Sequence, residues 1–186
     1  MSCTRRSFLA SAFLLAASLR AGRAAAALAR GLTLDELVAR SAHGLVVTPL
    51  DAHCAWAPFG KNRVIVTDTR VRIEELLLGA EPESAELAVR VLGGRLGELG
   101  ERVSGQAELV RGVPSLLFLT RAADARFFVT GAAQGHYPLV ADARGERRLL
   151  TSPHVPALLK PGTAAVSHLR GRTLPEAREL IRAARR

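Results

Sequence analysis

Residues 63–75 read RVIVTDTRVRIEE, and this stretch decides the fold class of the chain. From Ile65 to Ile73 the odd positions hold apolar or β-branched residues, whereas the even positions from Asp68 to Glu74 are charged. A repeat of two residues matches the alternating faces of a β-strand and does not match the turn of an α-helix. The stretch therefore predicts one long strand with a buried face and a solvated face.

Other segments of the chain also have strand character. Leu87, Val89 and Val91 alternate with their neighbours in the same way. Residues 116–119 are continuously apolar, as is typical of a strand that is covered on both faces. The remaining predicted strands are 44–47, 52–57, 127–129, 137–141 and 147–150. About seven or eight short strands separated by Gly and Pro indicate a mainly β fold, either a sandwich or a barrel.

Two helix start signals bracket these strands. Thr33 and Thr173 are each followed three residues later by a glutamate, which is the capping-box pattern. The first signal predicts a short helix. The second opens residues 174–184, where apolar residues at helical spacing lie opposite arginines, and it predicts an amphipathic C-terminal helix. The segment 151–171 is rich in Pro and Gly and is predicted to be an extended surface connection.

The first residues of the chain have the layout of an export signal. Arg5 and Arg6 precede Phe8 and Leu9, and an apolar run continues to Leu19. This run is shorter than the roughly 20 apolar residues that span a bilayer, which favours a cleavable signal. Consecutive arginines followed by x-Phe-Leu resemble the twin-arginine signal motif, which a receptor reads as an address.

Small residues at 24–26 and 27–29 each fit a signal-peptidase site, and we expect cleavage after Ala29. The alternative is an uncleaved N-terminal anchor. The expected partners are the twin-arginine export machinery and signal peptidase, and the mature chain is expected to be periplasmic or secreted, with no membrane anchor. The predicted segments are a signal peptide (1–29), a barrel domain with its leading helix (30–150), and a connection with the C-terminal helix (151–186).

Much of the positive charge belongs to the predicted signal. The full chain has 26 Lys and Arg against 17 Asp and Glu, whereas the chain after Ala29 has 22 against 17, a net charge of +5. A nucleic-acid-binding protein concentrates basic residues on one face together with stacking aromatics. Aromatic residues make up only 4% of this chain, so a nucleic-acid partner is not expected.

Residues with catalytic or metal-binding chemistry are scattered. Cleavage removes Cys3, so Cys54 is alone, either buried or available for pairing with another molecule. His53 and Cys54 are adjacent and point to opposite faces of a strand. No two histidines have the i, i+4 spacing of helical zinc ligands, and no G-x-S-x-G motif is present. We predict no catalytic residues, no metal and no cofactor. The five histidines are His43, His53, His136, His154 and His168.

Glycines recur at five positions in the segment 93–105. The run matches neither the G-x-G-x-x-G fingerprint nor the P-loop, because it lacks their spacing and the lysine. It predicts a looping connection or bulge between barrel strands. The alternative is a ligand-binding edge lined by backbone. The glycines are Gly93, Gly94, Gly97, Gly100 and Gly105.

Trp56, Phe59 and Lys61 form the candidate binding surface. They lie on a predicted loop just before the long strand, where exposed aromatic side chains are unfavourable without a function. Aromatic residues on a loop anchor a partner or fold back as a lid on one end of a barrel. Both interpretations remain open at this point.

The order of these motifs resembles a group of uncharacterised exported bacterial domains with a small OB-like β-barrel. The resemblance rests on residues 64–68, 71–79, 87–97, 103–105, 116–119 and 131–135 and covers roughly Leu45 to Leu139. It implies an OB-like barrel of about seven strands and implies no activity. The chain is therefore expected to be an exported, non-catalytic binding or accessory protein whose partner is an envelope protein or small ligand. The alternative is a small exported hydrolase or metal-binding protein that uses His, Cys and Asp residues.

Replacement of Arg5 and Arg6 by lysine should prevent export and leave the precursor in the cytoplasm, because the export receptor recognises the arginine pair itself. Cell fractionation with immunoblotting measures the ratio of cytoplasmic precursor to processed chain. Lysine preserves the positive charge of this region, so unimpaired export of the variant would show that the arginine pair is not an address.

Overall fold

Strands β2 and β3 form a long hairpin on which the rest of the fold is built. The computed structural model describes residues 28–185, in which β2 spans His43–Phe59 and β3 spans Asn62–Leu78. The two strands pair antiparallel across a two-residue turn of Gly60 and Lys61. Gly60 has a φ of 60°, the left-handed conformation that tight hairpin turns require.

The hairpin confirms the long strand predicted at residues 63–75. The two strands predicted at 44–47 and 52–57 are parts of a single strand. Its pairing register with β3 shifts between Pro49 and Asp51. Such an irregularity bends a strand without ending it, which is why the sequence pattern shows two strands where the structure has one.

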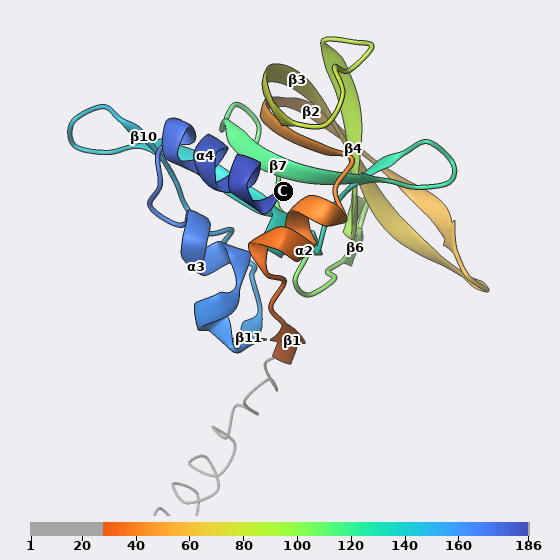
Figure 1. The fold of residues 1–186 in the computed structure, drawn as a ribbon. Helices are drawn as coiled ribbons and strands as arrows, with labels where there is room; N and C mark the ends of the chain where they lie inside the picture. Colours follow the sequence, from red (N-terminus) through yellow and green to blue (C-terminus); the bar gives the residue numbers. More distant parts are fainter. Residues whose placement is uncertain (1–27, 186) are drawn as a thin grey trace, which may run out of the picture.

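Five strands close into a ring-like arrangement (Figure 1). β3 pairs with β4, β4 pairs in parallel with β8, β8 pairs with β7, and β7 pairs back to the first part of β2. β9 and β10 extend the sheet beyond β7, so the main sheet has seven strands and the mainly β fold is confirmed. The bounds are Glu86–Leu92 for β4, Ser115–Arg121 for β7, Phe127–Val129 for β8, His136–Ala141 for β9 and Arg147–Leu149 for β10.

Strand β7 separates two apolar cores, one inside the ring and one between the sheet and the helices. Leu117 and Leu119 belong to the ring core, whereas Leu116 and Phe118 belong to the core that the helices cover. All four side chains are 0% exposed. Because successive residues of a strand point to opposite faces, a strand between two cores is apolar at every position. The two-sided burial predicted for residues 116–119 is confirmed.

Three helices cover the second core, and the two predicted capping boxes are present. The Glu36 carboxylate accepts the Thr33 backbone N–H at 3.0 Å, and the Thr33 hydroxyl oxygen accepts the Glu36 backbone N–H at 3.2 Å. These bonds satisfy backbone donors that have no partner within the helix. Both predicted helices are confirmed. The helices are α2 (Leu34–Ala39), α3 (Ala165–Leu169) and α4 (Leu174–Ala184).

The segment 151–171 is more ordered than its composition predicts. It contains β11 (Ala157–Leu159), the short 3₁₀ helix η2 (Pro161–Thr163) and helix α3. Leu169 in α3 is 0% exposed, so this part is not a surface connection. A helix of one turn has too few residues to show a periodic pattern, and its stability comes from tertiary packing.

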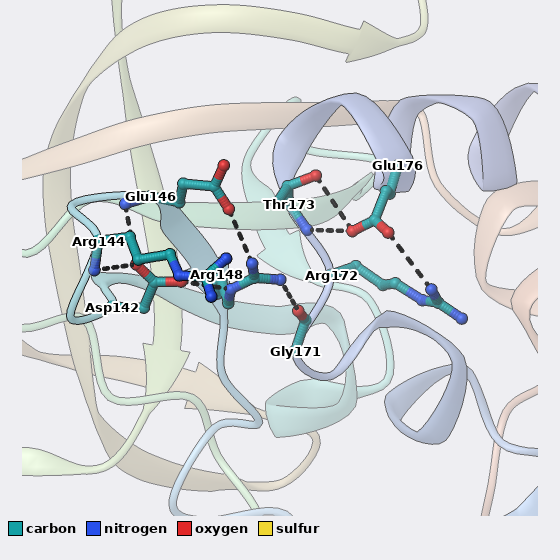
Figure 2. Close-up of polar contacts among 8 residues, drawn as sticks. All are labelled: Asp142, Arg144, Glu146, Arg148, Gly171, Arg172, Thr173 and Glu176. Carbon is teal, nitrogen blue, oxygen red and sulfur yellow. Dashed lines mark hydrogen bonds and ion pairs between the residues drawn. The ribbon is translucent and has the colours of Figure 1, made fainter.

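Arg148 fastens the C-terminal segment to the edge of the sheet (Figure 2). Its guanidinium donates to Asp142 at 2.7 Å, to Glu146 at 2.7 Å and to the Gly171 carbonyl at 3.1 Å. The hydrogen bond from Arg148 is the main cause that holds the pKa of Asp142 below its ordinary value. The Gly171 N–H also donates to the Leu149 carbonyl at 2.7 Å. The chain leading into α4 therefore covers the β10 edge, where backbone groups would otherwise be unpaired.

The motif residues 5–9 of the predicted signal lie outside the described residues. The described chain begins with β1 (Leu28–Arg30), which pairs in parallel with β11. The predicted cleavage after Ala29 thus falls within a paired strand, whereas the other matching site, after Ala26, precedes that strand. Within the described part of the chain, no helix has the length and apolarity needed to cross a membrane.

The glycine-rich segment forms a small hairpin of β5 (Gly94–Leu96) and β6 (Leu99–Glu101). Gly94 has a φ of 143°, and a Cβ atom there would lie 2.8 Å from Cys54 Sγ and collide with the Thr67 hydroxyl. The small hairpin packs closely against the long one because this position has no side chain. The observed hairpin agrees with the predicted connection between strands.

Replacement of Gly94 by alanine should lower the free energy of unfolding by about 2–4 kcal/mol, because it combines backbone strain with a steric clash. Urea denaturation measures the change. Gly100 is the matched control, since it lies exposed in the same hairpin and an added Cβ would meet open space. Gly100→Ala should change stability by less than about 0.5 kcal/mol. Equal losses in both variants would contradict the close packing.

Candidate functional site

A groove of about 370 Å³ lies between the β2–β3 turn and the loop 122–126 that joins β7 to β8. Its floor consists of apolar side chains from three strands: Val64 and Val66 of β3, Leu92 of β4 and Phe128 of β8. The β4 residues that alternate with Leu92 fill the ring, so the groove lies on the outside of the ring. Its volume falls in the range of small-ligand sites, roughly 300–1,000 Å³.

A row of four side chains crosses the sheet at this groove. The pairing register places His53 opposite Asp68, Asp68 opposite Arg90, and Arg90 opposite Phe128. Arg90 Nε donates to Asp68 Oδ1 at 2.6 Å, and a second guanidinium nitrogen contacts the other carboxylate oxygen. The hydrogen bond with Asp68 raises the pKa of Arg90 above its ordinary value, although burial opposes the charge. The Arg90 side chain is 11% exposed, so the groove is lined by a guanidinium that the Asp68 carboxylate holds in place.

Polar residues from two loops form the rim of the groove. Asp124 and Arg126 make an ion pair at 3.1 Å. Gln106 comes from the long connection after β6, and its Oε1 accepts the Leu92 backbone N–H at 3.3 Å. An apolar floor with a few fixed polar groups is the usual composition of a small-ligand site. The groove therefore suits a mainly apolar ligand that also carries hydrogen-bonding groups.

The structure separates the three residues predicted as a binding surface. Phe59 lines the groove, whereas Trp56 lies on the other face of the hairpin. The guanidinium carbon of Arg63 is 5.7 Å from the centroid of the Trp56 ring. Lys61 is exposed in the turn. Trp56 is 41% exposed and Phe59 is 57% exposed, so neither is folded back as a lid. The predicted loop is wrong for both aromatic residues, because a two-residue turn leaves them in β2.

Sequence reasoning missed Arg90, Leu92 and Phe128 as groove residues. The alternation along β4 is the signal that places Arg90 and Leu92 on one face. An outward arginine on a strand is indistinguishable in sequence from a solvated charge. Its place in a groove depends on β8, which adjoins β4 only in the folded ring.

A larger hollow of about 720 Å³ lies beside the β5–β6 hairpin. Gly93 and Gly94 line it, so it is where the alternative of a backbone-lined ligand edge would apply. At one side His154 Nε2 is 2.6 Å from Glu108 Oε2. Glu101 is also part of the lining, and its carboxylate accepts the Ile65 backbone N–H at 2.7 Å. Much of this lining comes from the irregular segment that follows β6, whereas the groove rests on paired strands.

His136 lies between two serines in the interior. Its Nδ1 is 3.0 Å from Ser152 Oγ, and its Nε2 is 3.2 Å from Ser115 Oγ. The Ser115 hydroxyl donates to the Val113 carbonyl, so its oxygen is left to accept from a protonated Nε2. All three side chains are buried, with exposures of 1% to 3%, and no substrate reaches them without unfolding. The arrangement is a structural hydrogen-bond network of a neutral imidazole, and burial lowers the pKa of His136 to about 4.

The remaining candidates for metal or thiol chemistry do not converge. His53 and His168 are exposed, and the His43 ring packs edge-on against Phe127 at 5.5 Å between centroids. Cys54 is half-buried, with its Sγ 3.3 Å from the Thr67 hydroxyl. Among residues 28–185, no three His, Cys, Asp or Glu side chains are grouped as metal ligands.

Comparison of the chain with protein-family models, with curated proteins and with solved structures gave no match. The resemblance to exported OB-like domains therefore stays a prediction.

The buried His136 should make the protein less stable in acid. Its pKa is about 4 in the fold against 6.5 in the unfolded chain, so only the unfolded chain takes up a proton between these values. The stabilisation is complete above pH 6.5 and is lost as the pH falls towards 4, on the order of 3 kcal/mol in total. Urea denaturation at pH 7.5 and 4.5 should therefore show a steeper loss for the wild type than for His136→Gln.

His168→Gln is the matched control, because His168 is exposed and its removal should leave the wild-type pH dependence unchanged. The comparison between variants separates His136 from the carboxylates that also titrate in acid. The same pH dependence in wild type and His136→Gln would contradict the assignment.

Proposed function

We propose that the chain is an exported, non-catalytic binding or accessory protein of the bacterial envelope, with an OB-like barrel that binds its ligand in the groove. The observation that carries the proposal is the position of the groove relative to the strand order of the ring. The export signal is inferred from Arg5 and Arg6, and the ligand site from the geometry of the described residues.

The strand order supports an OB-like barrel. Along the chain, β2, β3, β4, β7 and β8 are the first to fifth strands of the ring. Around the ring their order is first, second, third, fifth, fourth and back to the first. The third and fifth strands are parallel, and the other neighbours are antiparallel. A five-stranded barrel of this Greek-key type is the OB-fold architecture.

The groove lies where OB-folds bind their ligands. That site is the face of the second and third strands, flanked by the loop between the first two strands and the loop between the last two. Here the second and third strands supply Val66 and Arg90, the first loop adjoins Phe59, and the last loop supplies Arg126. Because the apolar floor is larger than the polar part, we infer an apolar small ligand or an apolar segment of an envelope protein.

One observation favours the alternative of a small hydrolase. His154 bonded to Glu108 in the larger hollow is the pairing expected of a general base held by a carboxylate. That function would depend on the hollow and not on the groove, so variants of the two sites separate the two proposals.

Filling the groove should abolish ligand capture. Val64→Trp places a large ring on the half-buried groove floor, and Val140→Trp makes the same change on β9, where Val140 is 45% exposed and away from the groove lining. The tagged mature chain is incubated with envelope extract, and retained molecules are identified by mass spectrometry. We expect a specifically retained component with wild type and Val140→Trp and none with Val64→Trp.

Circular dichroism establishes that each variant is folded. Equal retention by wild type and Val64→Trp would refute the groove as the binding site. Loss of retention in His154→Ala with full retention in Val64→Trp would move the site to the larger hollow.

A further inference from the structure

The end of the β2–β3 hairpin projects beyond the ring. β7 pairs with β2 only from His43 to Val47, and the pairing of β4 with β3 ends at Val66. Residues 56–65, here called the hairpin tip, pair as strands only with one another. Figure 1 shows the gold tip of the hairpin reaching away from helices α2, α3 and α4. Residues 58–63, at the end of the tip, are all exposed.

Two large aromatic side chains are exposed on this tip. Trp56 is 41% exposed and Phe59 is 57% exposed. They lie on opposite faces of the hairpin, because Trp56 pairs with Ile65 whereas Phe59 lies three positions further along the strand. A flat protein partner would cover one face and leave the other aromatic ring in water. A layer that the tip enters end-on would cover both rings at once.

The charge of the hairpin around the tip has one sign. Residues 52–67 contain Lys61 and Arg63 and no Asp or Glu. Residues 94–102, which form the neighbouring β5–β6 hairpin and the residue after it, contain two arginines and two glutamates. This segment therefore has no net charge. Arg63 lies 5.7 Å from the Trp56 ring centroid, which places a cation beside an exposed aromatic ring. Aromatic rings with adjacent cations are suited to the interfacial layer of a membrane that contains anionic lipids.

We propose that the hairpin tip docks end-on on an anionic membrane surface. Trp56 and Phe59 enter the headgroup layer, and Lys61 and Arg63 contact lipid phosphates. A stable protein interface takes about 20–30 residues from each partner, whereas the exposed end of the tip is the short segment 58–63. The contact is peripheral and reversible, because two rings and two cations do not amount to a spanning anchor.

Trp56 is the only tryptophan of the chain, so its fluorescence reports on the tip directly. The mature full-length protein is titrated with vesicles of phosphatidylglycerol and phosphatidylethanolamine, and separately with phosphatidylcholine vesicles. With the anionic vesicles we expect a blue shift of the emission and protection from acrylamide quenching, both reversed by high salt. With phosphatidylcholine we expect neither change.

Charge variants test whether the tip is the contact. Lys61→Glu with Arg63→Glu should lower partitioning onto anionic vesicles by about tenfold or more in co-sedimentation. The control is Arg144→Glu with Arg170→Glu, which makes the same charge change at exposed positions away from the hairpin and should bind like the wild type. Phe59→Ala should weaken binding, whereas Leu150→Ala, which removes another exposed apolar side chain, should not.

Three results would overturn the proposal: unchanged Trp56 emission with anionic vesicles, equal losses in both charge pairs, or capture of a protein partner that requires Phe59 without any vesicle binding. The Trp56 emission and the charge variants of Lys61 and Arg63 test the tip apart from the groove, because none of these three residues lines it. Val64→Trp can lose its ligand and still bind vesicles, and a failure at the tip leaves capture by the groove intact.

Discussion

The pairing of β7 with the first residues of β2, from His43 to Val47, is the contact on which the rest of the structure depends. Without it β2 and β3 would end in an open edge, and β7 could not return to β4 through β8. The contact closes the ring and places β7 between two apolar cores. The register shift between Pro49 and Asp51 then lets β2 leave β7 while it stays paired with β3. The first part of β2 therefore belongs to the ring, and its last part belongs to the projecting hairpin.

The alternation of side chains along these strands also keeps the chemically reactive groups apart. His53 and Asp68 lie on the outside of the ring with Arg90, whereas Cys54 faces the other side and packs at Gly94. His136 is held in the interior by two serines. Catalysis requires such groups to converge at hydrogen-bonding distance in an accessible cleft, whereas binding requires only a shaped face with fixed polar groups. The proposed binding function rests on this arrangement, whereas the hydrolase alternative rests on His154 and Glu108 in the larger hollow.

The groove and the hairpin tip share Phe59, which lines one and ends the other. A ligand in the groove would therefore lie next to the surface that we propose contacts lipid. An apolar floor at that place suits molecules that are sparingly soluble and are met at a membrane. The two proposals rest on different observations, namely the apolar groove floor and the exposed, acid-free tip, and their combination would make the domain a peripheral binding module.

Local features of the chain were readable from the sequence by itself. The period-two stretch at residues 63–75, the two-sided strand at 116–119 and both capping boxes depend on neighbours along the chain, and all four are present. Helix α3 was not predicted, because it is too short for a periodic pattern and is stabilised by packing.

Only the tertiary structure decided where the outward-facing residues of the strands lie relative to one another. Arg90 and Phe128 meet at the groove because a parallel pairing joins β4 to β8 across a long stretch of sequence. Trp56 and Phe59 are exposed on a projecting hairpin because β7 and β4 stop pairing before the turn. The alternation along a strand indicates which of its side chains are buried. Which strand lies beside it depends on contacts between residues that are far apart in the sequence. For that reason the sequence determined most of the elements, and the fold determined the site.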